Sequence, residues 1–239
     1  MPRMPAVLAD SMTRWMGRPA TVTDVTQLSP GLLRVTFEGE ALRGRPWVPG
    51  CEVEFRVSER ELRHYTPAAY DAEKGSMDVV FQLHGEGPGV AWARGLGVGD
   101  QVLVLGPGGR PWLRPGTRPG SSHLFVGDAT AVGLFSVLIA ALGPAATVTG
   151  AVEAPTADVG AVKAMLPRLT VLPAVKGRPG EALNHWLKEH VRVAPDAAYL
   201  AGNAHSVQRL RARLCSAPLG MRRGDVAAKA FWAAGRTGL

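Results

Sequence analysis

The sequence has 239 residues, of which 46% are hydrophobic, and this suits a globular protein of one large domain or two ordinary ones. Its formal net charge is +7, and most of the excess lies in residues 121–239, which hold 13 basic and 7 acidic side chains. No basic run exceeds the pair Arg222-Arg223 or alternates with stacking aromatics, so the charge favours an anionic small molecule over nucleic acid. The alternative is that the charge serves solubility alone.

The sequence shows no targeting signal, no membrane-spanning run and no cysteine or histidine spacing typical of a disulfide or metal site. Residues 1–12 lack the pattern of a secretory signal, and the longest apolar run, residues 129–142, is too short to span a bilayer. The two cysteines, Cys51 and Cys215, are far apart and in no metal-ligand spacing, and the histidines pair with no ligand at a suitable spacing. We therefore expect a cytoplasmic, monomeric protein with no disulfide and no bound metal.

Residues 20–109 have the pattern of short strands and turns. Val53, Phe55 and Val57 alternate with polar residues, which is the period of a strand with one face on a core. A short helix is expected near residues 90–96. The expected strands are residues 20–28, 32–39, 51–57, 62–67, 77–83 and 101–106. Six such strands predict a small antiparallel β-barrel.

A proline- and glycine-rich connector, residues 110–120, separates this region from a different pattern. Strands are expected at residues 123–126, 147–152, 169–175 and 197–201, and helices at 130–142, 157–166, 180–191 and 204–215. This alternation predicts an α/β domain with a parallel sheet and helices on both faces. We predict two domains, residues 1–115 and 116–239, with ligands at the carboxyl ends of the parallel strands.

The segment Arg63, His64, Tyr65 and Thr66 closes one of the expected strands before Pro67. Alternation puts Arg63 and Tyr65 on the same face. An arginine fork for phosphate oxygens, a flat ring and a hydroxyl are what a flavin dinucleotide needs from a protein. The alternative is an ordinary strand with an exposed arginine and a half-buried tyrosine.

A glycine-rich turn follows a later strand and leads into the expected short helix. Gly85, Gly87 and Gly89 leave room for a ligand to approach the backbone, and the amides at a helix start favour phosphate. This turn is a candidate binding site for the pyrophosphate of a dinucleotide. The alternative is a tight turn in which Trp92 anchors the core.

The order of these motifs resembles the siderophore-interacting proteins, which are FAD-dependent ferric-siderophore reductases related to the ferredoxin reductases. The resemblance covers nearly the whole chain from about residue 20. Its motifs are Arg-x-Tyr-Thr at 63–66, His-Gly-x-Gly-Pro-x-x-x-Trp-Ala at 84–93, Gly-Asp-x-Val-x-Val-x-Gly-Pro at 99–107, Gly-Asp-Ala-Thr-Ala at 127–131, Ala-Gly-Asn-Ala at 201–204 and Phe-Trp-Ala-Ala-Gly at 231–235.

The resemblance implies a set of roles. The segment 63–66 would grip the flavin, with Tyr65, Thr66, Asp128 and Thr130 as candidate catalytic residues. The other cofactor contacts that it implies are His84, Gly85, Gly87, Pro88, Ala91, Trp92, Gly202, Asn203 and Trp232. Substrate contacts are proposed at Arg110, Lys229 and Arg236, where the alternative is a solvated charge. Capping of a helix is the alternative for Asp128, Thr130 and Asn203.

The predicted function is electron transfer from NADPH or NADH through FAD to iron(III) in a siderophore or another anionic ferric chelate. Three positions depart from the family pattern: Asn203 in place of glutamate, Ala233 in place of arginine, and Phe231 in place of tyrosine. Asn203 and Ala233 favour an alternative, a flavin- or siderophore-binding accessory or repurposed biosynthetic protein without NAD(P)H turnover.

Overall fold

The computed structural model describes residues 15–109, 111–114 and 120–235. The chain divides into two compact units between Pro111 and Trp112. Each unit has its own sheet and its own buried core.

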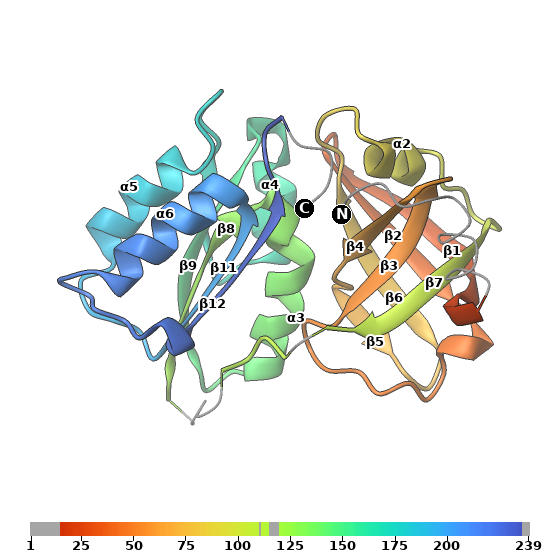
Figure 1. Cartoon of the computed structure of the whole chain (residues 1–239), viewed down its shortest axis with the longest axis horizontal. Coiled ribbons are helices and arrows are strands. Elements are labelled where there is room, and N and C mark those ends of the chain that lie inside the picture. The colour runs from red at the N-terminus through yellow and green to blue at the C-terminus, as the bar shows by residue number, and fades with distance from the viewer. Residues whose placement is uncertain (1–14, 110, 115–119, 236–239) are drawn as a thin grey trace. The chain divides into compact units, whose positions relative to one another are not determined.

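The first unit is one antiparallel sheet that curls around its core (Figure 1). Its strand order is β4-β3-β7-β1-β2-β6-β5. The strands are β1 (Arg18–Ser29), β2 (Leu32–Glu38), β3 (Glu52–Ser58), β4 (Glu61–Tyr65), β5 (Ala69–Asp71), β6 (Ser76–Gln82) and β7 (Gln101–Gly108). The expected barrel-like antiparallel fold is confirmed, with seven strands in place of six.

Alternating side chains build the core of this unit. Val53, Phe55 and Val57 on β3 are buried while their neighbours are not, and the residues of β6 alternate in the same way. Phe37, Phe55 and Phe81 gather at the centre, with ring centroids 4.8–6.5 Å apart. Burial of one face of the sheet therefore explains why the alternation predicted these strands correctly.

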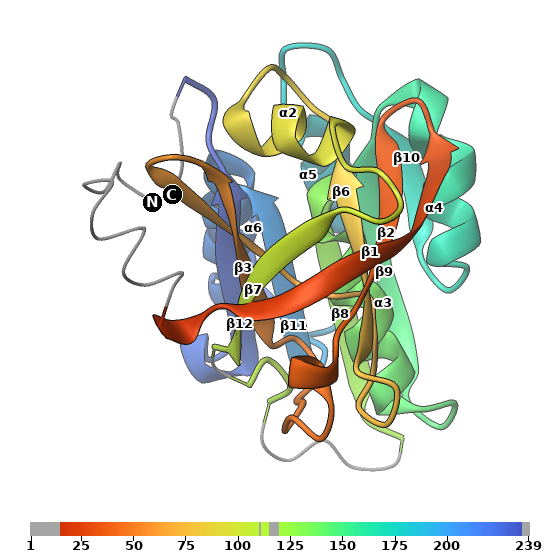
Figure 2. The ribbon, with the colours of Figure 1, turned by 90° about the vertical axis from the view of Figure 1, so that its right-hand side faces the viewer.

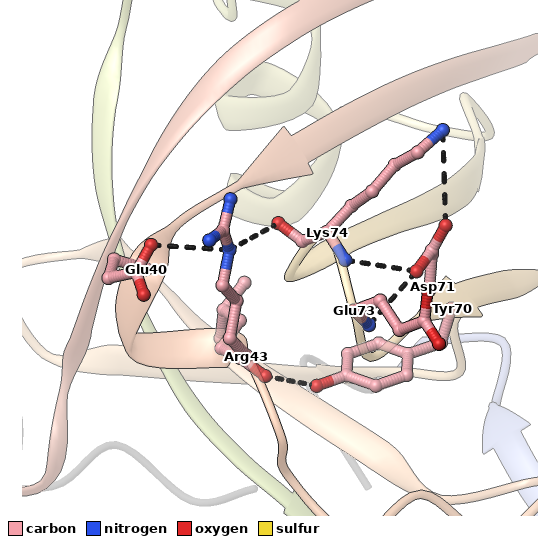
Figure 3. A network of polar contacts seen from close by, with 7 residues as sticks. Glu40, Arg43, Tyr70, Asp71, Glu73 and Lys74 are labelled. Carbon is pink, nitrogen blue, oxygen red and sulfur yellow. Dashed lines mark hydrogen bonds and ion pairs between the residues drawn. The ribbon is translucent and has the colours of Figure 1, made fainter.

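The strand that the sequence did not predict, β5, has only three residues and lies at the end of the sheet. Figure 3 shows how the adjacent turn is held: Asp71 Oδ1 accepts the backbone amides of Glu73 and Lys74, each at 3.0 Å. The hydroxyl of Tyr70 donates to the Leu42 carbonyl in the 3-10 turn η1 (Glu40–Leu42). Arg43 bridges the same two segments through the Lys74 carbonyl, at 3.3 Å. Tertiary contacts rather than local propensity therefore form β5.

The short helix α2 (Pro88–Arg94) begins and ends two residues before the predicted range. Pro88 occupies the first helical turn, where its missing N–H has no intrahelical partner to lose, and Gly95 ends the helix. The proline therefore marks the start of the helix better than the apolar pattern does.

The second unit is a five-stranded parallel sheet with strand order β10-β9-β8-β11-β12. Helices α5 and α6 cover one face and α3 and α4 the other (Figure 1). The strands are β8 (Ser122–Asp128), β9 (Thr147–Ala154), β10 (Thr170–Pro173), β11 (Ala197–Asn203) and β12 (Val226–Trp232). The helices are α3 (Val132–Leu142), α4 (Val159–Met165), α5 (Glu181–His190) and α6 (Ala204–Cys215), and the short 3-10 turns are η2 (Ala129–Ala131), η3 (Thr156–Asp158) and η4 (Arg223–Asp225).

Burial on both faces explains the apolar strands of this unit. All seven residues of β11 are buried. On β8, Leu124 and Val126 pack toward α5 and α6, while Phe125 packs edge-on against Phe135 of α3. The predicted parallel α/β fold is confirmed, with β12 as an additional strand.

Strand β12 was not predicted because its sequence, residues 226–232, contains three alanines and a lysine, which do not favour strands. It forms by parallel pairing with β11, from Ala198 opposite Val226 to Gly202 opposite Ala230. Figure 2 shows β12 at the end of the sheet beside β11. Within the part of the chain that the structure describes, no helix has the length and apolar character needed to cross a membrane.

Candidate functional site

Strand β4 carries the predicted segment Arg63, His64 and Tyr65, and Thr66 follows directly. In the antiparallel pair with β3, Arg63 lies opposite Phe55 and Tyr65 opposite Val53. Directly opposite residues share a face, so Arg63 and Tyr65 lie on the face of the two buried apolar residues, as the alternation predicts. Thr66 is half-buried just beyond the strand end.

Arg63 is held by an ion pair that the sequence reasoning did not identify. Its Nη2 lies 3.2 Å from Oε1 of Glu61, whose side chain is only 6% exposed, and its Nη1 donates to the Leu62 carbonyl at 2.9 Å. Arg63 itself is 19% exposed. A guanidinium has five N–H donors, so donors remain for a phosphate while Glu61 fixes the direction of the side chain.

His64 lies on the opposite face of β4, between two glutamates of β3. Its Nδ1 is 3.7 Å from Glu52 and its Nε2 is 3.7 Å from Glu54. The structure therefore places His64 in an acidic environment, apart from the face that carries Arg63 and Tyr65. Within the described residues, histidine, cysteine and acidic side chains form no group of three that could hold a metal ion.

Tyr65 is packed into the aromatic centre of the first unit. Its ring lies 4.6 Å from that of Phe81 and 6.0 Å from that of Phe55. Burial raises the pKa of the Tyr65 phenol to about 12, although the nearby charge of Arg63 lowers it. The phenol is therefore neutral at physiological pH and can donate a hydrogen bond.

Gly89, in the first turn of α2, lies directly against Tyr65. A Cβ added at this position would come within 2.7 Å of the Tyr65 hydroxyl oxygen and 3.5 Å of Arg63 Cγ. The close approach requires glycine, and it brings α2 against the two residues of β4. The structure therefore joins two motifs that are more than 20 residues apart in the sequence.

The other residues predicted around the glycine-rich turn differ in exposure. His84, Gly85, Gly87 and Ala91 are exposed, and Pro88 is half-buried at the helix start. Nothing lies within 4 Å of a Cβ added at Gly85 or Gly87. Trp92 instead packs against Phe55 and Phe81, with centroids 5.0 and 5.9 Å away, and so anchors α2 to the core.

In the second unit, the carboxylate of Asp128 joins the ends of three neighbouring strands. Its Oδ1 accepts from the Thr130 backbone N–H at 3.0 Å and also from the Thr130 hydroxyl. Its Oδ2 accepts from the Asn203 backbone N–H at 2.7 Å and from the Trp232 indole Nε1 at 2.9 Å. Asp128 ends β8, Asn203 ends β11 and Trp232 ends β12.

Gly202 and Asn203 complete this cluster. Gly202 has φ +126°, and an added Cβ would lie 2.3 Å from Asp128 Oδ2, so a side chain at 202 would displace the carboxylate. The Asn203 side chain is buried and accepts the Ser206 backbone N–H at 3.2 Å, which caps α6. The alternative role of helix capping is thus present at Asp128 and Asn203.

The cluster lies where the strand order reverses. The chain goes from β8 outward to β9 and β10, then returns to β11 on the other side of β8. In open parallel sheets, ligands bind at this switch point, outside the carboxyl ends of the strands. Asp128, Thr130, Gly202, Asn203 and Trp232 therefore lie together at the favoured ligand position of this unit.

Of the three proposed substrate contacts, only Lys229 is described. It is exposed on β12, in register with Ala201 of β11. Arg110 and Arg236 lie outside the described residues.

Three site features were missed from the sequence: Glu61 beneath Arg63, the contact of Gly89 with Tyr65, and Glu153 at the end of β9. Glu153 is 4% exposed and its Oε1 accepts the Gly180 backbone N–H at 3.0 Å. The Glu-x-Arg spacing within one strand was the signal available for Glu61, because residues i and i+2 share a face.

Comparison with known proteins identifies the family to which both units are similar. Residues 52–111 match a family model described as a siderophore-interacting FAD-binding domain, and residues 120–235 match one described as siderophore-interacting protein. Ferric vibriobactin reductase ViuB of Vibrio cholerae is 31% identical in an alignment 136 residues long, which covers 47% of this chain and 49% of that protein. The match thus spans about half the length of this curated relative.

Solved structures show the same fold at low sequence identity. The siderophore-interacting protein of Acinetobacter baumannii has a TM-score of 0.78 at 18% identity, over 92% of this chain and 91% of that chain. Phthalate dioxygenase reductase, a modular protein for electron transfer from pyridine nucleotides, has a TM-score of 0.70 at 14% identity, over 92% of this chain and 70% of that chain. The fold is therefore ferredoxin-reductase-like.

Proposed function

The chain belongs to the siderophore-interacting protein family, and we propose that it is an FAD-dependent reductase that passes electrons from NAD(P)H to iron(III) in a siderophore. In this proposal residues 1–115 bind FAD and residues 116–239 bind NAD(P)H. The name of the ViuB relative, a ferric vibriobactin reductase, supports the proposed substrate class.

The observation that carries the proposal is the shared face of Arg63 and Tyr65, packed against Gly89 within the stretch that matches an FAD-binding domain. Arg63 keeps N–H donors for a pyrophosphate because its ion pair with Glu61 uses only part of the guanidinium. The neutral Tyr65 phenol and the Thr66 hydroxyl offer hydrogen bonds to a flavin ring. The open space in front of Gly85 and Gly87 fits the approach of a ligand to the backbone.

When bound, FAD supplies the conversion between hydride transfer and single-electron transfer, which no amino-acid side chain provides. The protein has to bind and orient the partners. Iron(III) in the siderophore is the substrate, and its reduction releases the metal because iron(II) binds hard oxygen ligands less strongly. No nucleophilic side chain is required.

We assign Asp128 and Thr130 a positioning role. All four hydrogen bonds described for the Asp128 carboxylate come from within the protein, so it holds the ends of β8, β11 and β12 at the switch point. Gly202, Asn203 and Trp232 are thereby fixed at the edge where we propose that NAD(P)H binds. Lys229 remains a proposed contact to the anionic chelate, as do Arg110 and Arg236.

Visible spectroscopy tests the proposal. The purified protein, supplied with FAD, should be yellow, should bleach anaerobically on addition of NADPH or NADH, and should recover its colour when a ferric siderophore is added. A protein that binds no FAD would contradict the proposal.

Arg63→Ala should weaken FAD binding by about tenfold or more, because a charge-assisted contact is lost. Arg60→Ala, at an exposed arginine just before β4, is the matched control.

A second candidate is a flavin- or siderophore-binding protein without NAD(P)H turnover. The capping role of Asn203 favours it, because that side chain is used within the protein. A yellow protein that neither nicotinamide bleaches would support this candidate and exclude the reductase.

A further inference from the structure

The loop between β10 and α5 lies at the carboxyl edge of the parallel sheet. Ala174, just after β10, donates its backbone N–H to the Ala154 carbonyl at the end of β9, at 2.7 Å. The chain then makes a tight turn closed by the hydrogen bond from Arg178 N–H to the Val175 carbonyl, at 3.0 Å. Lys176 and Arg178 are both exposed on this turn. Two cations therefore lie next to the end of β9.

Glu153 occupies the position from which an acidic residue would recognise a ribose. In dinucleotide-binding sheets, an Asp or Glu after the second strand accepts a hydrogen bond from the ribose 2′-hydroxyl of NADH. A nearby arginine instead accommodates the 2′-phosphate of NADPH. Glu153 lies near the end of the second strand, β9, in register with Asp128. It is 4% exposed and bonds to the Gly180 backbone N–H at the start of α5, so it faces the protein and not a ribose.

The other carboxylates near this edge are also engaged or buried. Asp128 accepts four hydrogen bonds, Asp158 is 2% exposed, and Glu181 lies 3.9 Å from Arg209. Within the described ranges, Lys176 and Arg178 form no ion pair. The side of the edge formed by β9 and β10 therefore presents two exposed cations that no described acidic side chain pairs with.

We infer that Lys176 and Arg178 bind the 2′-phosphate of NADPH, and that the chain discriminates against NADH for this reason. The inference rests on the proposed function, in which the dinucleotide lies along the carboxyl edge of this sheet. A phosphate offers several anionic oxygens to a lysine and an arginine, whereas the 2′-hydroxyl of NADH offers no charge. Because Glu153 is buried, its carboxylate is not exposed to accept a hydrogen bond from the 2′-hydroxyl of NADH.

Titration calorimetry with 2′,5′-ADP and 5′-AMP, at low salt, tests the binding step without turnover. We expect 2′,5′-ADP to bind about tenfold or more tightly than 5′-AMP, because the two probes differ only in the 2′-phosphate. Lys176→Ala and Arg178→Ala should each weaken 2′,5′-ADP binding by about tenfold and leave 5′-AMP unchanged. Lys188→Ala, at an exposed lysine in the last turn of α5, should change neither.

Reduction of the flavin by each nicotinamide separates this inference from the proposed function. We expect a higher kcat/KM with NADPH than with NADH, and Lys176→Ala/Arg178→Ala should bring the two values together through KM for NADPH. If both nicotinamides reduce the protein equally well and 2′,5′-ADP binds no tighter than 5′-AMP, the inference is overturned and the reductase stands. If neither nicotinamide reduces the flavin and neither probe binds, both are overturned.

Discussion

The indole Nε1 of Trp232 donates a hydrogen bond to Oδ2 of Asp128 at 2.9 Å, across 104 positions of sequence. The same oxygen accepts the Asn203 backbone N–H, so one carboxylate oxygen holds the ends of β11 and β12 to the end of β8. A carboxylate is suited to this because it only accepts, and every partner around it is a donor. One side chain therefore ties together the ends of the three strands at the switch point.

Asp128→Asn should loosen this edge of the sheet. An asparagine keeps one acceptor oxygen and turns an NH2 group toward donors, so at least two N–H or O–H groups lose their partner. We expect a loss of about 2–3 kcal/mol in the free energy of unfolding and faster hydrogen exchange at the Asn203 amide. Urea unfolding and amide exchange measure the two effects. Asp225→Asn, which affects only an exposed pair with Arg222, should leave both nearly unchanged.

Trp232→Phe should lower the free energy of unfolding by less, about 1–2 kcal/mol. It removes one hydrogen-bond donor and leaves the Asp128 carboxylate with three hydrogen bonds. In the double variant with Asp128→Asn the unpaired indole donor is gone. The combined loss should therefore be smaller than the sum by about 1 kcal/mol, which a double-mutant cycle measures in urea. Strict additivity would show that the indole and the carboxylate do not interact.

The two sheets were predictable from the sequence because their cores follow simple periods. Val53, Phe55 and Val57 alternate, and the apolar strands of the second unit carry the pattern of a sheet buried on both faces. Strands β5 and β12 were not predicted from the sequence because both depend on contacts with other segments and not on a local pattern. The first is a short segment at the end of the sheet, held by the contacts of Tyr70 and Asp71, and the second is alanine-rich and forms only against β11.

The candidate site was predictable only in part. Shared faces within one strand, as for Arg63 and Tyr65, follow from local geometry. Partners distant in sequence do not, and this applies to Trp232 with Asp128 and to Gly89 with Tyr65. The orientation of Glu153 was equally hidden, because the sequence does not say whether an acidic residue at a strand end caps a helix or faces a ligand.

Gly89→Ala should disturb Tyr65. The added Cβ would come within 2.7 Å of the tyrosine hydroxyl oxygen, so either α2 or the ring has to shift. We expect a loss of about 1–3 kcal/mol in the free energy of unfolding, as for other overpacked sites, together with weaker FAD binding. Thermal unfolding and fluorescence titration with FAD measure the two quantities.

The matched controls for this contact are Tyr65→Phe and Gly87→Ala. Removing the hydroxyl gives the new methyl group room, so Gly89→Ala/Tyr65→Phe should be destabilised less than the two single changes predict together. At Gly87, nothing lies within 4 Å of an added Cβ, so alanine there should leave packing intact. If Gly89→Ala is as stable as Gly87→Ala, the described contact with Tyr65 does not exist in solution.

The three tyrosines should resist ionisation in the folded protein. Burial raises the pKa of Tyr65 to about 12 and also raises the pKa of Tyr70 and of Tyr199 above the ordinary value of 10.0. At pH 10 the folded protein should therefore show less tyrosinate absorbance at ~295 nm than the urea-unfolded chain, which should be about half ionised. Above pH 10 the folded state holds more protons than the unfolded state, so stability should fall as the pH rises through the folded pKa values. Tyr65→Phe should remove the step near pH 12, and three tyrosines that titrate at pH 10 in the folded protein would contradict the burial described here.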